Sequence, residues 1–205
     1  MPVPVALRAT SLPARRAASL RRIIAYLTPD QVARLLNFCH DKRSHLLVNV
    51  LWRTGARITE AIRMTPDHLD PTAKVIRIES VKRGVPVRQV PLADDLAAEL
   101  MDYVLHHRDQ MPGGLFFPFS RGHAWRIITG IAARAGLTNG ASGRRIFPHI
   151  FRHSFAIHHL KNQTGLPVIQ ALLGHQDIGS TAIYLKTLQQ EDAVAIARRV
   201  VFSEP

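Results

Sequence analysis

Cysteine and long apolar runs are nearly missing from this sequence, and each shortage excludes a class of protein. Cys39 is the only cysteine among 205 residues, so an internal disulfide is impossible and a cysteine-based zinc site is not expected. No apolar run approaches the roughly 18 residues that a membrane span needs. The first 22 residues contain arginine but no apolar stretch followed by a cleavage site, so they do not resemble a secretory signal. We therefore expect a protein of a reducing cytoplasm.

Acidic residues are also scarce. The sequence has 15 Asp and Glu against 27 Lys and Arg, which gives a formal net charge of +12, and no acidic residue lies between Asp109 and Asp177. Such a surplus favours a polyanionic partner, either a nucleic acid or an anionic membrane surface. Structural nucleic-acid binders share the surplus, so charge alone does not identify an enzyme.

The chain length suggests one domain with an appendage. Residues 1–25 carry five arginines and no acid, which predicts a basic, partly disordered arm, and residues 26–205 form the folded domain. Residues 74–81 and 87–92 alternate and are rich in β-branched residues, as in an antiparallel hairpin. The predicted fold class is α+β, mainly α-helical, with one small antiparallel sheet. The expected helices cover residues 27–39, 45–55, 57–64, 94–111, 122–136, 149–160, 166–174, 180–188 and 190–201.

The stretch HIFRHSFAIHHL places His149 and Arg152 one turn apart on one helix face, among apolar neighbours. Burying an arginine is costly unless the cation is paired. Two interpretations stay open from these residues alone. Arg152 pairs with a carboxylate in an ordinary core helix, or it receives an anion from outside, and a phosphate suits its planar fork.

Other residues of these helices favour structural interpretations. His158 and His159 invite a metal site with His149, but His159 lies two turns, roughly 10 Å, beyond Arg152. A polar surface or a contact between helices is the favoured interpretation. Trp52 and Trp125 lie in apolar helical stretches and are expected in the core.

Two further stretches complete a pattern. TGARITEAIRM places Arg57 after a helix-ending glycine, and LLGHQDIGSTAIYLK places Tyr184 nine residues after His175. With Lys82 in the hairpin turn and the HIFRH helix, the order resembles the catalytic domain of the tyrosine recombinase, or phage integrase, family over about residues 26–190. A short member is indicated, Xer-like or similar to the recombinases that switch fimbrial promoters.

The resemblance implies a role for each matching residue. Arg57 and Arg152 would hold the non-bridging oxygens of a scissile phosphate, His149 would take a proton from the nucleophile Tyr184, and Lys82 would protonate the leaving oxygen. His175 matches the third motif. Glu60 and His153 would support these groups. Contacts to DNA are expected from the arginines of the arm and the hairpin, namely Arg15, Arg16, Arg21, Arg22, Arg83 and Arg88.

The chemistry suits these residue types. Attack on a phosphodiester builds charge on its equatorial oxygens, and two arginines form a fixed clamp for that charge. A phenol needs a proton acceptor and a positive field, and an alkoxide leaving group needs a general acid. A covalent 3′-phosphotyrosine would conserve the bond energy. We therefore expect no metal, no ATP and no other cofactor.

The resemblance also implies partners. Double-stranded DNA, a tetrameric synapse on that DNA and accessory DNA-bending proteins are expected, in the bacterial cytoplasm. The helix over residues 190–201 would dock on a neighbouring protomer. Most family members carry an additional N-terminal DNA-binding domain of about a hundred residues, which we do not expect here. Inversion, integration, excision and multimer resolution stay open as outcomes. The alternatives are a catalytically idle DNA-binding regulator and a relaxing enzyme similar to type IB topoisomerases.

Overall fold

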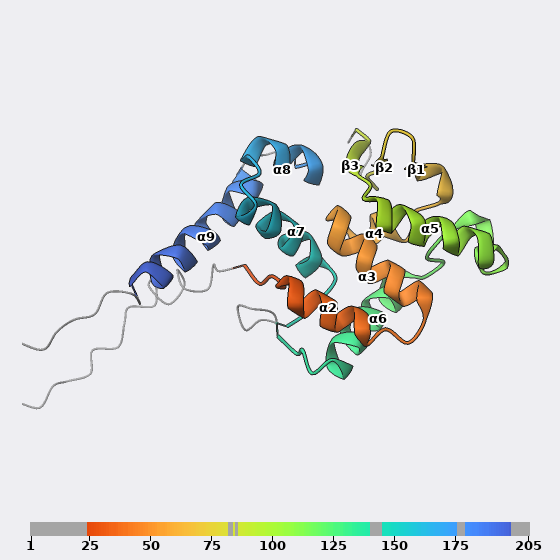
Figure 1. Ribbon diagram of the computed structural model, residues 1–205, viewed down its shortest axis with the longest axis horizontal. Coiled ribbons are helices and arrows are strands. Elements are labelled where there is room, and N and C mark those ends of the chain that lie inside the picture. Colours follow the sequence, from red (N-terminus) through yellow and green to blue (C-terminus); the bar gives the residue numbers. More distant parts are fainter. Residues whose placement is uncertain (1–23, 82–83, 85, 140–144, 176–178, 198–205) are drawn as a thin grey trace, which may run out of the picture.

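The computed structural model describes residues 24–81, 84, 86–139, 145–175 and 179–197. The described chain is mainly helical with a small antiparallel sheet, which confirms the predicted fold class (Figure 1). The helices are α2 (Pro29–Asn37), α3 (Lys42–Thr54), α4 (Ile58–Ala61), α5 (Asp94–His106), α6 (Arg121–Arg134), α7 (His149–Lys161), α8 (Leu166–Leu173) and α9 (Gly179–Ala197). The strands are β1 (Leu69–Asp70), β2 (Val75–Ile78) and β3 (Arg88–Pro91), and short 3₁₀ turns are η1 (Pro66–His68), η2 (Arg108–Gln110) and η3 (Pro112–Gly114).

Local sequence signals set the ends of the first two helices. The Thr28 hydroxyl accepts from the Gln31 backbone N–H at 3.3 Å, and the Gln31 side chain accepts from the Thr28 N–H at 3.0 Å, which is a capping box. Gly55 ends α3 in the left-handed conformation with φ of 60°. A Cβ atom at Gly55 would lie 2.8 Å from the Phe155 ring. The chain therefore turns tightly against α7 directly before Arg57.

The sheet places one charged residue on its inner face. The predicted hairpin is confirmed by the pairing of β2 with β3, in which Ile76 faces Val90 and Ile78 faces Arg88. Alternate residues of a strand point to the same side, so Arg88 and Val90 both point inward and both are buried. Strand β1 was not expected, because two residues are too few to show alternation.

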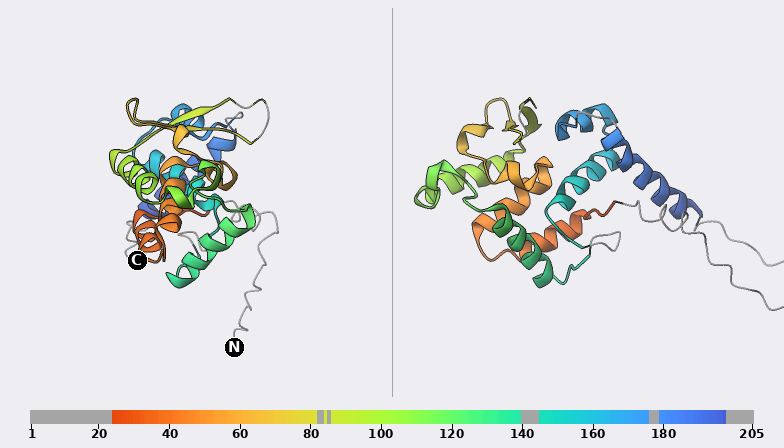
Figure 2. Two further views of the ribbon diagram at one scale, coloured as in Figure 1. Left: turned by 90° about the vertical axis from the view of Figure 1, so that its right-hand side faces the viewer. Right: turned by 180° about the vertical axis from the view of Figure 1, so that it is seen from behind.

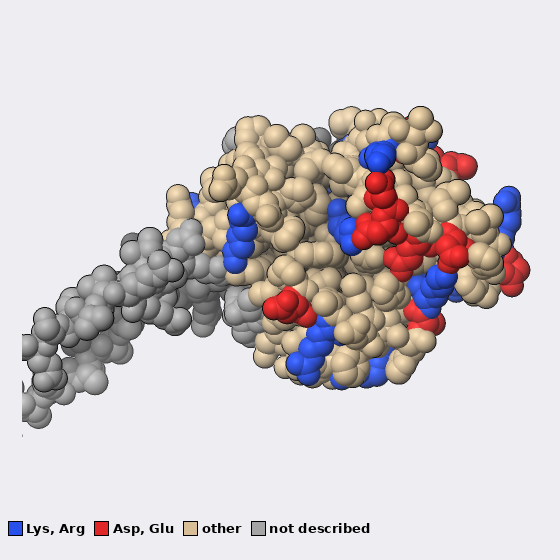
Figure 3. Space-filling model, in the orientation of Figure 1, with Lys and Arg blue, Asp and Glu red and all other residues tan. Residues whose placement is uncertain are grey.

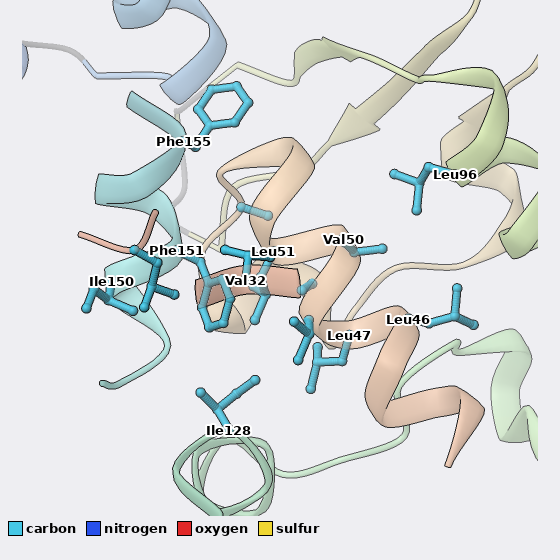
Figure 4. Close-up of a cluster of buried hydrophobic side chains, with 14 of the residues drawn as sticks. Val32, Leu46, Leu47, Val50, Leu51, Leu96, Ile128, Ile150, Phe151 and Phe155 are labelled. Carbon is cyan, nitrogen blue, oxygen red and sulfur yellow. The ribbon is translucent and has the colours of Figure 1, made fainter. Parts of the chain in front are cut away.

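Helix α3 forms the centre of the apolar core (Figure 4). Leu47 and Leu51 of α3 point toward Phe151 of α7, and Ile128 approaches from α6. Leu96 of α5 covers the opposite side of α3. Because α3 is covered on several sides, its end at Gly55 and the following turn have a fixed place relative to α7.

Helix α9 is longer than expected. The sequence predicts two helices, over residues 180–188 and 190–201, whereas residues 179–197 form one continuous helix. No glycine or proline lies between Ser180 and Ala197, so nothing in the sequence breaks the helix. Seen from either side, α9 leaves the bundle on the side away from α5 (Figures 1 and 2).

Acidic side chains are unevenly distributed over the surface. Acidic side chains gather on the side that carries α3 and α5 (Figure 3). There Asp95 pairs with Arg53 at 2.6 Å, Glu99 pairs with His45 at 2.5 Å, and Asp102 pairs with Lys42. Helices α6, α7 and α8 contain no acidic residue. No helix in the described part of the chain is long and apolar enough to cross a membrane.

Candidate active site

Arg57 lies in the turn between α3 and α4. Its backbone N–H donates to Glu60 Oε2 at 2.8 Å, and its guanidinium donates to Glu60 Oε1 at 2.9 Å. The side chain of Arg57 is 40% exposed, whereas that of Glu60 is only 1% exposed. One end of Arg57 is thus fixed by a buried carboxylate, and the residue remains accessible to an anion.

Arg152 is buried in the first turn of α7 without a carboxylate partner among the described residues. Its guanidinium donates to the Gly55 carbonyl at 2.9 Å and to the Leu173 carbonyl at 2.5 Å. Burial, with the charges of Arg57 and Arg88, lowers the pKa of Arg152 to about 9. The structure therefore contradicts the first interpretation of this arginine, because its partners are two backbone carbonyls and not a carboxylate. Its pairing with an external anion stays a prediction.

A cavity of about 520 Å³ lies beside these residues. Arg57 and His149 line it together with Arg121 and Trp125 of α6. Trp125 was expected in the core, but it is 49% exposed, so that expectation was wrong. The helical periodicity of α6 could not show which of its apolar positions faces this cavity. Arg121 was also missed, although it begins a helix in a region without acids.

Tyr184 is held beside α7. Its side chain is 2% exposed, and its hydroxyl lies 3.1 Å from Nδ1 of His153. The ring of His149 meets the ring of His153 edge-on at 4.7 Å. Burial lowers the pKa of His149, with help from Arg152 and Arg57, and it lowers that of His153 to about 3. His153, expected only to support the site, is thus the histidine that contacts the phenol.

His175 follows the left-handed Gly174 at the end of α8. Its Nδ1 lies 2.8 Å from the Thr181 hydroxyl on α9, and its ring lies nearly parallel to that of Tyr184 at 6.4 Å. Burial and the nearby arginines, Arg152 first, lower the pKa of His175 to about 4. The His175 ring is therefore neutral at pH 7 and lies beside the phenol ring of Tyr184.

Glu60 also binds Arg88. Arg88 NH2 donates to Glu60 Oε2 at 2.6 Å, and its Nε donates to the Leu172 carbonyl at 2.8 Å. Burial alone would raise the pKa of Glu60, but Arg88 and Arg57 lower it below its usual range. Arg88 was expected to contact DNA phosphates, whereas the structure places it inside the protein, because β3 turns this position inward.

Several predicted residues lie outside the described part of the chain. Lys82 and Arg83 of the hairpin turn belong to this group, and so do the arginines of the arm, Arg15, Arg16, Arg21 and Arg22. Their roles stay predictions. Within the described ranges, no three side chains of His, Cys, Asp or Glu form a group that could hold a metal ion.

The sequence pattern has an independent counterpart in a family profile. The profile described as "Phage integrase family" matches residues 25–191. The chain belongs to the phage integrase family. The matched range runs from before α2 into α9 and contains Arg57, Arg152 and Tyr184.

Individual phage integrase family members are similar over most of this chain. "Tyrosine recombinase XerD" of Mycobacterium leprae is 32% identical over 193 residues, which cover 82% of this chain and 59% of that protein. The catalytic domain of bacteriophage HP1 integrase has a TM-score of 0.59 at 26% identity and covers 84% of this chain and 94% of its own. XerH recombinase bound to its difH substrate has a TM-score of 0.68 at 22% identity, with 83% of this chain and 53% of that chain covered.

The chain spans about three fifths of the length of the M. leprae relative. Its match to the HP1 catalytic domain covers 84% of this chain and 94% of that domain. The shared part is therefore the catalytic fold of the family.

Proposed function

We propose that this chain carries the strand-cleaving activity of a site-specific DNA recombinase. Tyr184 would attack a phosphodiester, form a 3′-phosphotyrosine bond and release a 5′-hydroxyl, and the reverse reaction would rejoin DNA. The observation that supports this best is the meeting of Tyr184 with His153 and His175, beside a cavity lined by Arg57.

Each described residue has a place in that reaction. The Tyr184 oxygen forms the new bond to phosphorus as the bond to the 5′-oxygen breaks. The phenol proton leaves to a neighbouring base, and Lys82 would protonate the leaving 5′-oxygen. His153 is the nearest acceptor, because its neutral Nδ1 faces the hydroxyl. Distance favours His153 over His149 as the first proton acceptor, but a ring with a pKa of about 3 is a weak base, so this role requires the anionic phosphate in the site, which would raise that pKa. Arg57 and Arg152 would hold the two non-bridging oxygens and stabilise the charge that develops there.

Tyr184→Phe tests this function. The probe is duplex DNA that flanks the gene of this protein, searched in overlapping fragments. We expect the natural chain to form an adduct that survives detergent and disappears with protease, and we expect Tyr184→Phe to bind the same DNA without forming it. An adduct with the Phe variant would show that another nucleophile acts. No adduct with the natural chain on any fragment would favour an idle DNA-binding regulator.

Partners follow from the same proposal. The solved relatives include XerH in complex with difH DNA and a dimer of lambda integrase bound to a core site. We propose double-stranded DNA as the substrate of this chain, in the bacterial cytoplasm, with a homotetramer on DNA. Sedimentation of the DNA complex checks the tetramer. A stable synapse of two duplexes distinguishes a recombinase from a topoisomerase-like relaxing enzyme.

A further inference from the structure

Arg88 joins two parts of the candidate site that are distant in sequence. We propose that Arg88 is a positioning residue of the phosphate clamp, which holds the Glu60 carboxylate and the end of α8 at the same time and so fixes Arg57 and His175 relative to each other. The proposal rests on the proposed function, because the clamp matters only if the site binds a phosphate.

The first observation is the burial of the ion pair. The side chain of Arg88 is 7% exposed and that of Glu60 is 1% exposed. Burying two opposite charges is costly, and the cost is recovered only when the geometry is good and further hydrogen bonds satisfy both groups. Arg88 meets that condition, since it donates to both oxygens of Glu60, at 2.6 and 3.3 Å, and to the Leu172 carbonyl at 2.8 Å.

The second observation is that Glu60 divides its charge between two arginines. Its two oxygens accept two hydrogen bonds from Arg57 and two from Arg88, which fills the roughly four lone-pair positions of a carboxylate. Without Arg88, the whole negative charge of Glu60 would act on Arg57. With Arg88 present, Arg57 is oriented by Glu60 but keeps more of its positive potential for an anion in the cavity.

The third observation concerns the C-terminal end of α8. The last carbonyls of a helix have no partner within the helix. Here Arg88 donates to the carbonyl of Leu172 and Arg152 donates to that of Leu173. A Cβ atom at Gly174 would lie 3.1 Å from Cδ of Arg88, so this turn packs closely on the arginine stem. His175 is the next residue, and its position therefore depends on Arg88.

These contacts argue against the simpler role of a phosphate contact. All three guanidinium nitrogens of Arg88 already donate within the protein, two to Glu60 and one to the Leu172 carbonyl. Arg88 points to the inner face of the sheet and directs its nitrogens at Glu60 and Leu172. It acts on the substrate through other residues.

Arg88→Lys tests the proposal, because lysine keeps the charge but cannot bond both Glu60 and the Leu172 carbonyl. The first probe is inorganic phosphate, titrated into the full chain and followed through the NMR signals of the His149 ring beside Arg57. We expect phosphate affinity to fall about 10- to 100-fold, the range observed when the partner that orients a ligating group is lost. Arg53→Lys alters an exposed ion pair with Asp95 on the other side of α3 and should leave the affinity unchanged.

A second variant separates positioning from folding. Glu60→Gln combined with Arg88→Met removes both buried charges, so it avoids an unpaired carboxylate. We expect it to unfold at nearly the natural temperature and still bind phosphate weakly. Loss of folding in both variants would make Arg88 a folding residue and would overturn the proposal, as would natural phosphate affinity in Arg88→Lys.

DNA gives the third measurement. On a fragment that yields the Tyr184 adduct, Arg88→Lys should lower the single-turnover rate of adduct formation while the salt dependence of DNA affinity stays unchanged. The Glu60→Gln, Arg88→Met variant removes the positive charge at this position, so a salt slope smaller by about one in that variant would mean that Arg88 contacts a phosphate directly, and would overturn the proposal. If the natural chain forms no adduct at all, the proposed function fails, whereas the phosphate titration still decides the role of Arg88.

Discussion

At the scale of single residues, the Tyr184 phenol is kept in its protonated form. Burial raises its pKa, although Arg152 and Arg57 act in the opposite direction. The only described side chain that bonds its hydroxyl is His153, whose depressed pKa keeps the ring neutral and makes it a weak base.

His153→Gln should reduce the pH dependence of stability. The folded-state pKa of His153, about 3, lies below its ordinary value of 6.5. As the pH falls from 7 to 5, the unfolded chain takes up a proton at this residue and the folded chain does not, so folding is destabilised. We expect the unfolding temperature of the natural chain to fall over this range and that of His153→Gln to fall less.

The remaining decrease in that variant comes from His175, whose folded pKa is about 4, and from His149 and His159, whose pKa values burial also lowers. The exposed His123 gives a control, because His123→Gln should keep the natural pH dependence. An equal decrease in His153→Gln and the natural chain would mean that folding does not lower the pKa of His153.

Lys82 is tested by changing the leaving group. We expect Lys82→Ala to cleave ordinary DNA about 10²- to 10⁴-fold more slowly, as for a lost general acid. With sulfur in place of the bridging 5′-oxygen, the thiolate leaves without a proton, so Lys82→Ala should cleave nearly as fast as the natural chain. Arg152→Ala should be slow on both substrates, because the clamp acts on the non-bridging oxygens. A defect of Lys82→Ala that is equal on both would remove it as the acid.

The sequence predicts some of these residue roles better than others. The roles of Arg57 and Arg152 are predicted from the resemblance, whose motifs place each arginine at a fixed distance from a glycine or a histidine within one local element. The choice between His149 and His153 as the partner of Tyr184 depends on how α7 packs against α9, which no local spacing encodes. The inward position of Arg88 could have been predicted, because strand alternation places it on the same side of the sheet as the apolar Val90.

At the scale of elements, the turn at Gly55 determines where the clamp lies. Gly55 combines a positive φ with close contact to Phe155 and Leu173, so a side chain there is both strained and obstructed. Gly113 has nearly the same φ, 62°, but has no atom within 4 Å of its expected Cβ. The two glycines therefore separate backbone strain from crowding.

Gly55→Ala should destabilise the fold by about 2–4 kcal/mol, from left-handed strain and overpacking together. Gly113→Ala should cost only the strain, about 1 kcal/mol. Urea unfolding of both variants measures the difference. Similar costs for the two would mean that α7 moves aside to accept the methyl group.

Element boundaries show where sequence patterns stop being informative. Helix α3 ends at Gly55 as the sequence predicts, but it begins at Lys42 after the Asp41 cap, three residues before the expected start. Helix α9 has no such signal near residue 189, and the two apolar patterns on either side were interpreted as separate helices. Strand β1 exists only because β2 is beside it, so its formation is a tertiary effect.

At the scale of the whole molecule, acidic side chains gather on the side of α3 and α5 and are absent from three other helices. The ion pairs of α3 and α5 neutralise that side, whereas α6, α7 and α8 carry no acid. A duplex would therefore approach from the side that holds the cavity at Arg57 and His149. The arm over residues 1–23 adds five arginines to this surplus.

Deleting residues 1–23 should weaken binding to all DNA sequences alike. Each arginine that contacts a phosphate contributes about 0.9 to the slope of log affinity against log salt. We expect a smaller slope for the shortened chain, measured by fluorescence anisotropy with two unrelated duplexes. An unchanged slope would mean that the arm does not touch DNA.

The burial of Tyr184 has a practical consequence for following the protein at work. The chain has three tyrosines, and Tyr26, Tyr103 and Tyr184 are 5%, 1% and 2% exposed. Reagents that nitrate accessible phenols therefore find almost no target in the free protein. Any tyrosine that reacts after DNA is added has become exposed to solvent, and its position in the peptide map identifies the segment that moved.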